Sequence, residues 1–223
     1  MKCYYQGCTK KGITKEHIPP RSFFLKGENE QLLTVKSCEK HNNGKATDDQ
    51  YVLAQICRIA SPTSNRANEV FLKKIKPQLS HNDSAFKKML SKGAVTLDDG
   101  SVKYPVDTKR FDDFFTALSC GIIFKTCNKQ VPENYVIHHQ YPNFSSEDSV
   151  GEQGLHVFEE FKQLISGEPM KVLDFGKPNT QNESIYKVKV FGMPGFNSSI
   201  TVVHLFYGKF EVVSFLSNFR ASA

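Results

Sequence analysis

The sequence predicts an α+β fold, from three observations along its 223 residues. Residues 1–46 contain three cysteines and many turn-forming residues but no long apolar run, so burial alone cannot stabilise them. Residues 47–127 show mainly helical spacing of apolar residues, and residues 184–216 show strand patterns separated by tight turns. We therefore expect a metal-stapled module (1–60), a basic helical connector (61–100) and an α+β domain (101–223) that ends in an antiparallel sheet.

Each expected element has a local signal. Thr47-Asp48-Asp49 begins a helix that Pro62 ends, and the connector contains basic helical segments at 66–78 and 84–92. Asp98-Asp99-Gly100 is typical of a hairpin turn between short strands at 94–97 and 101–104. Apolar spacing predicts helices over 106–127 and 152–165. Strands are expected over 135–138, 184–191, 199–207 and 210–216.

The charge of the chain is unevenly distributed. Residues 1–100 contain 17 Lys and Arg against 10 Asp and Glu, whereas residues 101–223 contain 12 against 13. A basic half joined to a neutral half favours a polyanionic partner for the first half. No apolar run approaches the length of a membrane span, and the polar N-terminus does not resemble a secretory signal, so we expect a cytoplasmic protein that does not enter membranes.

The six cysteines separate into two groups. Cys3-x4-Cys8 and Cys38-x2-His41 form two close pairs, separated by 29 residues, and this arrangement is typical of a structural zinc site with four ligands. A simpler interpretation makes Cys3 a terminal residue and His41 an ordinary polar one. The remaining cysteines lie in apolar helical patterns and are expected to fill the core: Cys57, Cys120 and Cys127.

Two further motifs surround the second pair. Glu16-His17-Ile18-Pro19 precedes it, and Asn42-x-x-Lys45 directly follows His41. Together with the paired ligands, these motifs resemble the HNH (ββα-metal) endonuclease family, including the HNH domain of CRISPR RNA-guided nucleases. The resemblance covers about residues 1–50. Residues 38–51 are also similar to a group of uncharacterised prokaryotic HNH proteins with a C-terminal extension, which residues 111–132 resemble loosely.

The resemblance implies a role for each motif residue. His17 would be the general base that takes a proton from water, while Glu16 and Asn42 would hold one Mg²⁺ or Mn²⁺ ion at the scissile phosphate. Lys45, one helical turn beyond Asn42, would lie near phosphate. Arg21 and Asn43 are further candidates for contacts with the nucleic-acid backbone.

The sequence departs from the family pattern at two positions. The strand position that is often Asn, which orients the base histidine, falls within Leu32-Leu33-Thr34-Val35, so the backbone or Asn29 would have to replace it. His41 stands where the family usually has Cys, and it would either bind zinc or belong to the cation site. His138-His139 suggests a second metal site, but no acidic or thiol partner follows at regular spacing, so we do not expect one.

The expected function is that of a metal-dependent endonuclease acting on DNA, double-stranded and with little base specificity, because phosphate contacts carry no sequence information. A role in bacterial defence is compatible with the resemblance. One alternative is a zinc-stapled nucleic-acid-binding protein without catalysis, and another is an RNase or toxin-like nuclease. Residues 101–223 are suited equally to forming a homodimer or to binding a sensor or regulatory protein.

Overall fold

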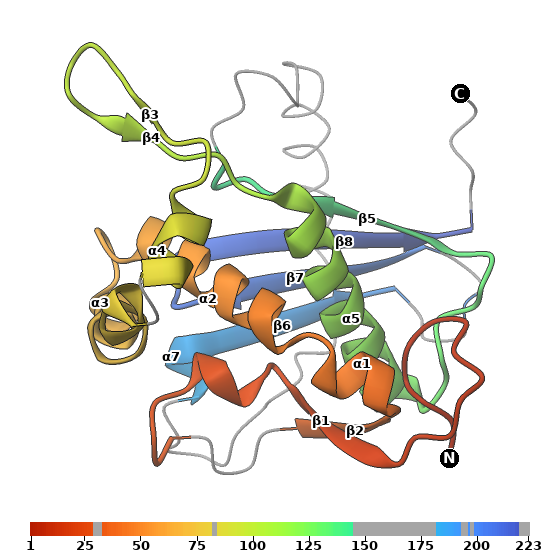
Figure 1. The fold of residues 1–223 in the computed structure, drawn as a ribbon. Helices are drawn as coiled ribbons and strands as arrows, with labels where there is room; N and C mark the ends of the chain where they lie inside the picture. The colour runs from red at the N-terminus through yellow and green to blue at the C-terminus, as the bar shows by residue number, and fades with distance from the viewer. Residues whose placement is uncertain (29–32, 82–83, 145–181, 193–195, 197–198, 219–223) are drawn as a thin grey trace.

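A computed structural model describes residues 1–28, 33–81, 84–144, 182–192, 196 and 199–218. Its N-terminal part is an antiparallel hairpin of β1 (Thr14–Ile18) and β2 (Leu33–Ser37), followed by α1 (Glu39–Asn43) and α2 (Ala46–Ala60). Figure 1 shows the hairpin beside α1 at one end of the molecule. The predicted helix before Pro62 is thus confirmed. Assignment of this part to the HNH family stays a prediction.

The connector is helical, as expected. Helix α3 (Asn65–Val70) continues through a π-helical turn (Phe71–Ile75) and a 3₁₀ turn (Lys76–Ser80), and α4 (Ala85–Leu90) follows. The Ser64 side chain caps α3 by accepting a hydrogen bond from the Ala67 backbone N–H. The predicted hairpin is also present, as β3 (Val95–Thr96) and β4 (Val102–Lys103).

The C-terminal half is built on one long helix and one sheet. Helix α5 (Thr108–Cys127) begins at the capping side chain of Asp107 and ends at Asn128, which has a positive φ. The antiparallel sheet has the order β5-β8-β7-β6. The four strands of this sheet confirm the predicted strands. The helix predicted over 152–165 lies outside the described residues. The elements are β5 (Val136–Gln140), the short helix α7 (Asn182–Ile185), β6 (Tyr186–Phe191), β7 (Ile200–Phe206) and β8 (Phe210–Ser217).

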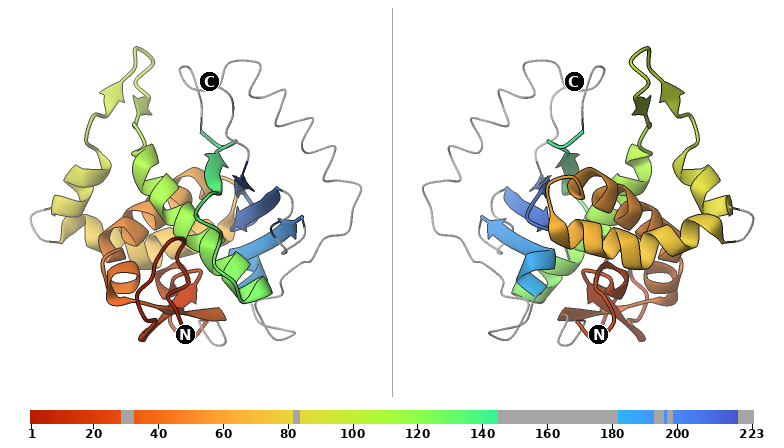
Figure 2. Two further views of the ribbon diagram at one scale, coloured as in Figure 1. Left: turned by 90° about the vertical axis from the view of Figure 1, so that its right-hand side faces the viewer. Right: turned by 90° about the vertical axis from the view of Figure 1, so that its left-hand side faces the viewer.

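Helix α5 contacts both the N-terminal hairpin and the sheet (Figures 1 and 2). Gly121 packs closely on β1: a Cβ built there would lie 2.4 Å from Cδ1 of Ile18. The turn between β7 and β8 is also joined to the N-terminal half, because the Tyr207 hydroxyl donates to the Phe23 carbonyl (3.0 Å) and the Ser64 hydroxyl to the Tyr207 carbonyl (2.9 Å). Buried side chains of all three predicted segments form one apolar cluster. The division at residues 60 and 100 stays a prediction.

A chain of polar side chains lies between α5 and the sheet. His139 contacts the hydroxyls of Thr116 (2.9 Å) and Ser214 (2.8 Å), and Ser214 in turn lies 3.2 Å from His204. His204 is completely buried and also contacts the hydroxyls of Ser119 and Tyr186. Burial lowers the pKa of both imidazoles, that of His139 to about 4, so both are neutral at pH 7.

Two of the three cysteines expected in the core, Cys57 and Cys120, are fully buried, and Cys127 is half-buried. Among the described residues, no helix combines the length and the apolar character that crossing a bilayer requires.

Candidate metal centre and active site

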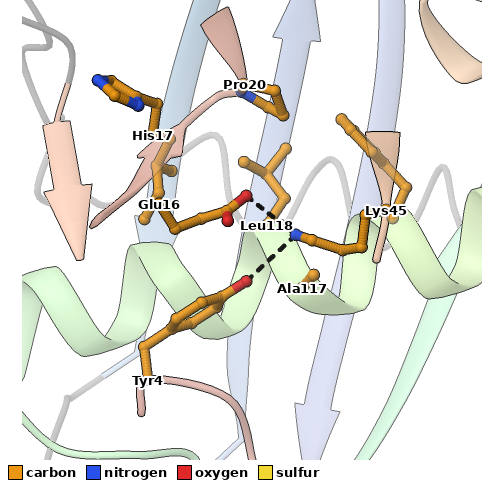
Figure 3. Close-up of a pocket in the computed structure, with 9 residues that line it drawn as sticks. Tyr4, Glu16, His17, Pro20, Lys45, Ala117 and Leu118 are labelled. Atoms are coloured by element: carbon orange, nitrogen blue, oxygen red, sulfur yellow. Dashed lines mark hydrogen bonds and ion pairs between the residues drawn. The ribbon is translucent and has the colours of Figure 1, made fainter. Parts of the chain in front are cut away.

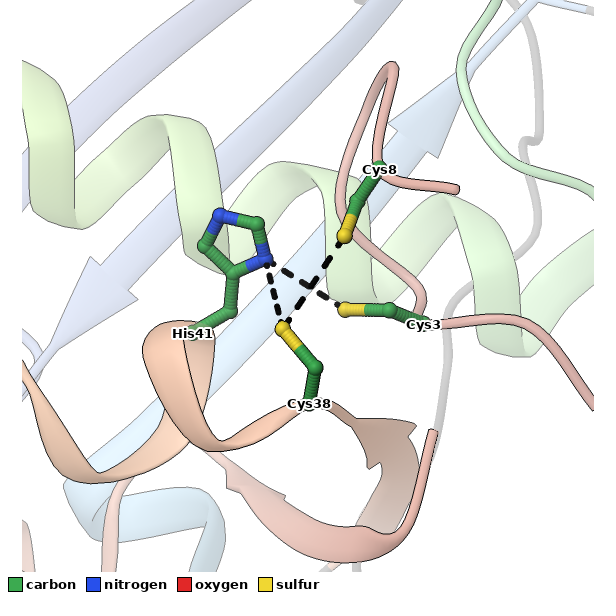
Figure 4. Close-up of side chains that lie close together, drawn as sticks. All are labelled: Cys3, Cys8, Cys38 and His41. Atoms are coloured by element: carbon green, nitrogen blue, oxygen red, sulfur yellow. Dashed lines mark hydrogen bonds between the residues drawn. The ribbon is translucent and has the colours of Figure 1, made fainter. Parts of the chain in front are cut away.

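The two predicted ligand pairs meet in one cluster (Figure 4). The ligand atoms of Cys3, Cys8, Cys38 and His41 all lie within 4.8 Å of one another. Nδ1 of His41 is 3.4 Å from Sγ of Cys3 and 3.4 Å from Sγ of Cys38, and the sulfurs of Cys8 and Cys38 are 3.9 Å apart. That sulfur separation is too long for a disulfide, and all the cysteines are free.

These distances fit a tetrahedral zinc site. With typical zinc bonds, the ligand atoms of an ideal tetrahedron lie about 3.8 Å apart for two sulfurs and about 3.6 Å apart for a sulfur and a nitrogen. The three separations given above are within a few tenths of an ångström of those values, and every pair of ligand atoms lies within 4.8 Å. The cluster is therefore suited to hold a metal ion such as zinc, and the His41 imidazole faces the thiols through Nδ1.

Local structure explains how the four side chains converge. Cys3 and Cys8 come from the N-terminal loop, which the bridge between Lys2 and Lys11 closes. Cys38 is the residue just before α1, and one turn of that helix brings His41 to the same side. The Tyr5 ring stacks on His41 with centroids 4.2 Å apart and fixes the plane of the imidazole.

Hydrogen bonding makes the thiol of Cys38 more acidic than an ordinary thiol. Burial raises its pKa, but hydrogen bonds from the His41 backbone and from the Cys3 and Cys8 thiols outweigh burial and leave the pKa below its usual value. Burial lowers the pKa of His41, and Lys40 lowers it further. A thiolate and a neutral imidazole are the protonation states that bind zinc.

Glu16 points into the protein, towards helix α5. Only 5% of the residue is exposed, and Oε1 accepts a hydrogen bond of 3.0 Å from the Lys45 ammonium, which also donates to the Tyr4 hydroxyl (3.3 Å; Figure 3). Burial raises the pKa of Glu16, while Lys45 opposes the increase. Oε2 of Glu16 has no hydrogen-bond partner among the described residues. Lys45 was expected to lie near phosphate. Its ammonium is instead paired with Glu16, the residue expected to bind the catalytic cation.

His17 leaves the opposite face of β1, as alternation along a strand requires. In Figure 3 its imidazole points away from the Glu16 carboxylate. Thr34 lies directly across the hairpin from His17, and it is part of the segment in which the family's Asn is missing. Burial lowers the pKa of the half-buried His17, and the charges of Arg21 and Lys15 lower it further. The imidazole is therefore neutral at pH 7, as a base must be.

Asn42 lies against β1. Its side-chain NH₂ donates to the Lys15 carbonyl (3.3 Å), which belongs to the peptide bond between Lys15 and Glu16. That hydrogen bond does not use the side-chain oxygen of Asn42, the atom expected to bind a cation. The two other residues expected to contact nucleic acid, Arg21 and Asn43, are exposed. The structure thus brings Asn42 next to the Glu16 main chain, while the side chains of Glu16 and His17 diverge.

Comparison with protein-family models, curated proteins and solved structures gives no match to this chain.

Two residues that belong to the Glu16 environment are absent from the predicted site. Tyr4, 1% exposed, contacts Lys45 directly. Asp49, on α2, has a pKa raised to about 7: burial raises it, Lys45 lowers it, and the charges of Glu16 and Asp48 raise it. The position of Asp49 one helical turn after Lys45 was a usable signal, because residues four apart share a helix face. Nothing near Tyr4 in the sequence marks it.

Proposed function

We propose that the protein is a metal-dependent nuclease that hydrolyses phosphodiester bonds of DNA at the face formed by β1 and α1. The observation that carries the proposal is the Cys3, Cys8, Cys38 and His41 cluster. A zinc ion there would fix α1 to the N-terminal loop and hold Asn42 on the Lys15–Glu16 peptide, beside His17. The position of Asn42 against β1 supports the proposal, whereas the Glu16 side chain, which faces Lys45, would have to turn for the three groups to meet at one cation.

Each side chain then has a defined task. A hard divalent cation, Mg²⁺ or Mn²⁺, would supply charge neutralisation at the scissile phosphate and at the departing oxygen. Oε2 of Glu16 and the side-chain oxygen of Asn42 would hold it, since Oε2 has no hydrogen-bond partner among the described residues and the Asn42 hydrogen bond to Lys15 uses the side-chain nitrogen. His17, neutral at pH 7, accepts the proton of the attacking water. Lys45 opposes the rise that burial causes in the pKa of Glu16 and so favours its ionised form.

Plasmid nicking in the presence of Mg²⁺ or Mn²⁺ tests this proposal. We expect the wild type to nick DNA, and His17→Ala to be about 10²- to 10⁴-fold slower, as loss of a general base requires. His138→Ala replaces an exposed histidine of β5 and should keep full activity. RNA offered beside DNA identifies an RNase. Absence of cleavage of either polymer by the zinc-loaded wild type would refute the nuclease proposal.

One observation favours a second function, a zinc-stapled nucleic-acid-binding protein without catalysis. The carboxylate expected to hold the catalytic cation is paired with Lys45 at 3.0 Å, and His17 points away from it. A protein in which that ion pair persists would bind nucleic acid but not cleave it. Binding by the wild type, with no nicking by either the wild type or His17→Ala, would favour this function.

A further inference from the structure

A basic groove of about 330 Å³ lies between the hairpin and the C-terminal end of α5. Lys15, Thr34 and Lys36 line it from β1 and β2, and Lys125 and Asn128 line it from the end of α5. Lys15 and Lys36 are paired across the two strands, so their side chains leave the same face of the hairpin. This set of residues is called the basic groove below.

The charges of the groove are not neutralised within the part of the chain that the structure describes. No carboxylate of a described residue lines it, and Lys15, Lys36 and Lys125 form no salt bridge with a described residue. Elsewhere the described lysines and arginines include several that are paired, such as Arg66 with Glu28 and Lys109 with Asp113. Three ammonium groups around one groove without a counter-charge favour an anionic ligand that carries several charges.

The groove is continuous with the face of β1 that presents His17. Lys15 and His17 are two residues apart in the strand, and their cross-strand partners are Lys36 and Thr34. Side chains two apart in a strand lie on one face. Arg21, exposed just beyond β1, is close enough for its charge to act on His17. Cationic side chains therefore lie on both sides of His17.

We propose that the basic groove binds the phosphate backbone of a nucleic-acid strand and leads that strand to His17. The inference rests on the proposed function, for which it supplies the path of the substrate. Phosphates that recur along a strand match cations that recur along a groove, and such contacts position a strand without reading its bases. The path uses Lys125 of α5, and so makes the C-terminal half a part of the substrate surface.

The test measures how binding of a fluorescent DNA duplex depends on salt concentration. The wild type is compared with the triple variant Lys15→Gln, Lys36→Gln, Lys125→Gln, and with the matched variant Lys87→Gln, Lys88→Gln, Lys92→Gln. The matched variant loses the same charge from exposed lysines in and after α4, which lies far from the β1–β2 hairpin in Figure 1. Binding is measured without added Mg²⁺ or Mn²⁺ and without chelator, so that zinc is retained and DNA is not cleaved.

The groove variant should bind more weakly, and its slope of log affinity against log salt should fall by about 0.9 for each lysine that contacts phosphate. The matched variant should keep the wild-type slope. An unchanged slope in the groove variant, or an equal fall in both variants, would overturn the proposal. Equally tight binding of poly-L-glutamate through the same three lysines would also overturn it, because the groove would then recognise an acidic polypeptide.

Nicking by the same variants separates this inference from the proposed function. Groove-dependent binding without nicking under any cation would support the groove and refute the nuclease. Full nicking by the groove variant would overturn the groove and leave the nuclease standing. Thermal unfolding of each variant checks that the substitutions, all at exposed or half-buried positions, leave the fold intact.

Discussion

The side-chain NH₂ of Gln130 lies 2.6 Å from the main-chain carbonyl of Cys3, 127 residues away in sequence. The same nitrogen contacts the carbonyls of Tyr5 (2.9 Å) and Cys8 (2.8 Å). In the opposite direction, Gln6 donates to the carbonyls of Pro132 and Tyr135. Two glutamines thus fasten the metal-ligand loop to the segment between α5 and β5.

Gln130→Ala should weaken this attachment. Leaving the loop carbonyls without their donor costs about 1–3 kcal/mol, so zinc should pass to a competing chelator faster than from the wild type. Gln50→Ala, on α2 and away from the loop, is the control. Equal rates of zinc transfer from all three proteins would show that Gln130 does not support the loop.

Removing one zinc ligand should remove the ion and much of the stability. We expect Cys38→Ser to purify with less than one zinc per chain and to unfold at lower temperature, because residues 1–46 depend on the metal. Cys127→Ser is the matched control, since this half-buried cysteine lies outside the cluster and its thiol donates to a backbone carbonyl that a hydroxyl can also reach. Elemental analysis and thermal unfolding give both quantities.

The Gly121–Ile18 contact predicts an unusual pair of effects. Gly121→Ala should destabilise the protein by about 1–3 kcal/mol, since the new methyl group overlaps Cδ1 of the buried Ile18. Ile18→Val removes that Cδ1 and alone should cost about 0.5–1.5 kcal/mol. The double variant should be more stable than Gly121→Ala alone. Additive losses in urea unfolding would contradict the packing of α5 on β1.

The Glu16–Lys45 pair predicts a pH dependence. Lys45→Met leaves Glu16 buried without its cation, so its pKa rises further above the unfolded value. A carboxyl group whose pKa is raised on folding destabilises the fold at high pH, where it is ionised. The loss of stability becomes smaller as the pH falls and Glu16 is protonated. We expect a loss of about 3 kcal/mol at pH 8 and less at pH 5. Lys109→Met, which breaks an exposed pair with Asp113, should cost little at either pH.

The buried histidines predict loss of stability in acid. Because His139 has a pKa of about 4 in the folded state, its contribution is complete above the unfolded value of 6.5 and declines as pH falls towards 4. The decline amounts to about 3 kcal/mol for this residue. His139→Gln keeps hydrogen-bonding groups but does not titrate, so its urea midpoint should fall less between pH 7 and pH 4.5. Both proteins carry the same metal cluster, so we expect zinc loss in acid to lower both midpoints alike.

Local signals explain why much of the fold was predictable. The helix over 106–127 has an apolar face, and the hairpin at 95–103 has a turn sequence that fixes it, so both appear close to their expected bounds. The metal cluster was predictable for a similar reason, because short loops bring Cys3 to Cys8 and Cys38 to His41.

The contacts between distant segments had no such signal. The side chain of Glu16 faces Lys45 because β1 packs its inner face on α5, and the sequence of β1 does not contain that partner. Gln130 and the chain of hydroxyls around His204 depend in the same way on side chains brought together only by the tertiary fold. Tyr4, which the sequence did not mark as a site residue, also reaches the site only through the tertiary fold.

The contacts of Tyr207 with Phe23 and Ser64 affect the order in which the protein can fold during synthesis. During synthesis, the ribosome releases the hairpin and α2 long before the β7–β8 turn exists, so the loop after β1 must wait for a partner made more than 180 residues later. A nascent chain would therefore carry its ligand cysteines while the Phe23 carbonyl still lacks its donor.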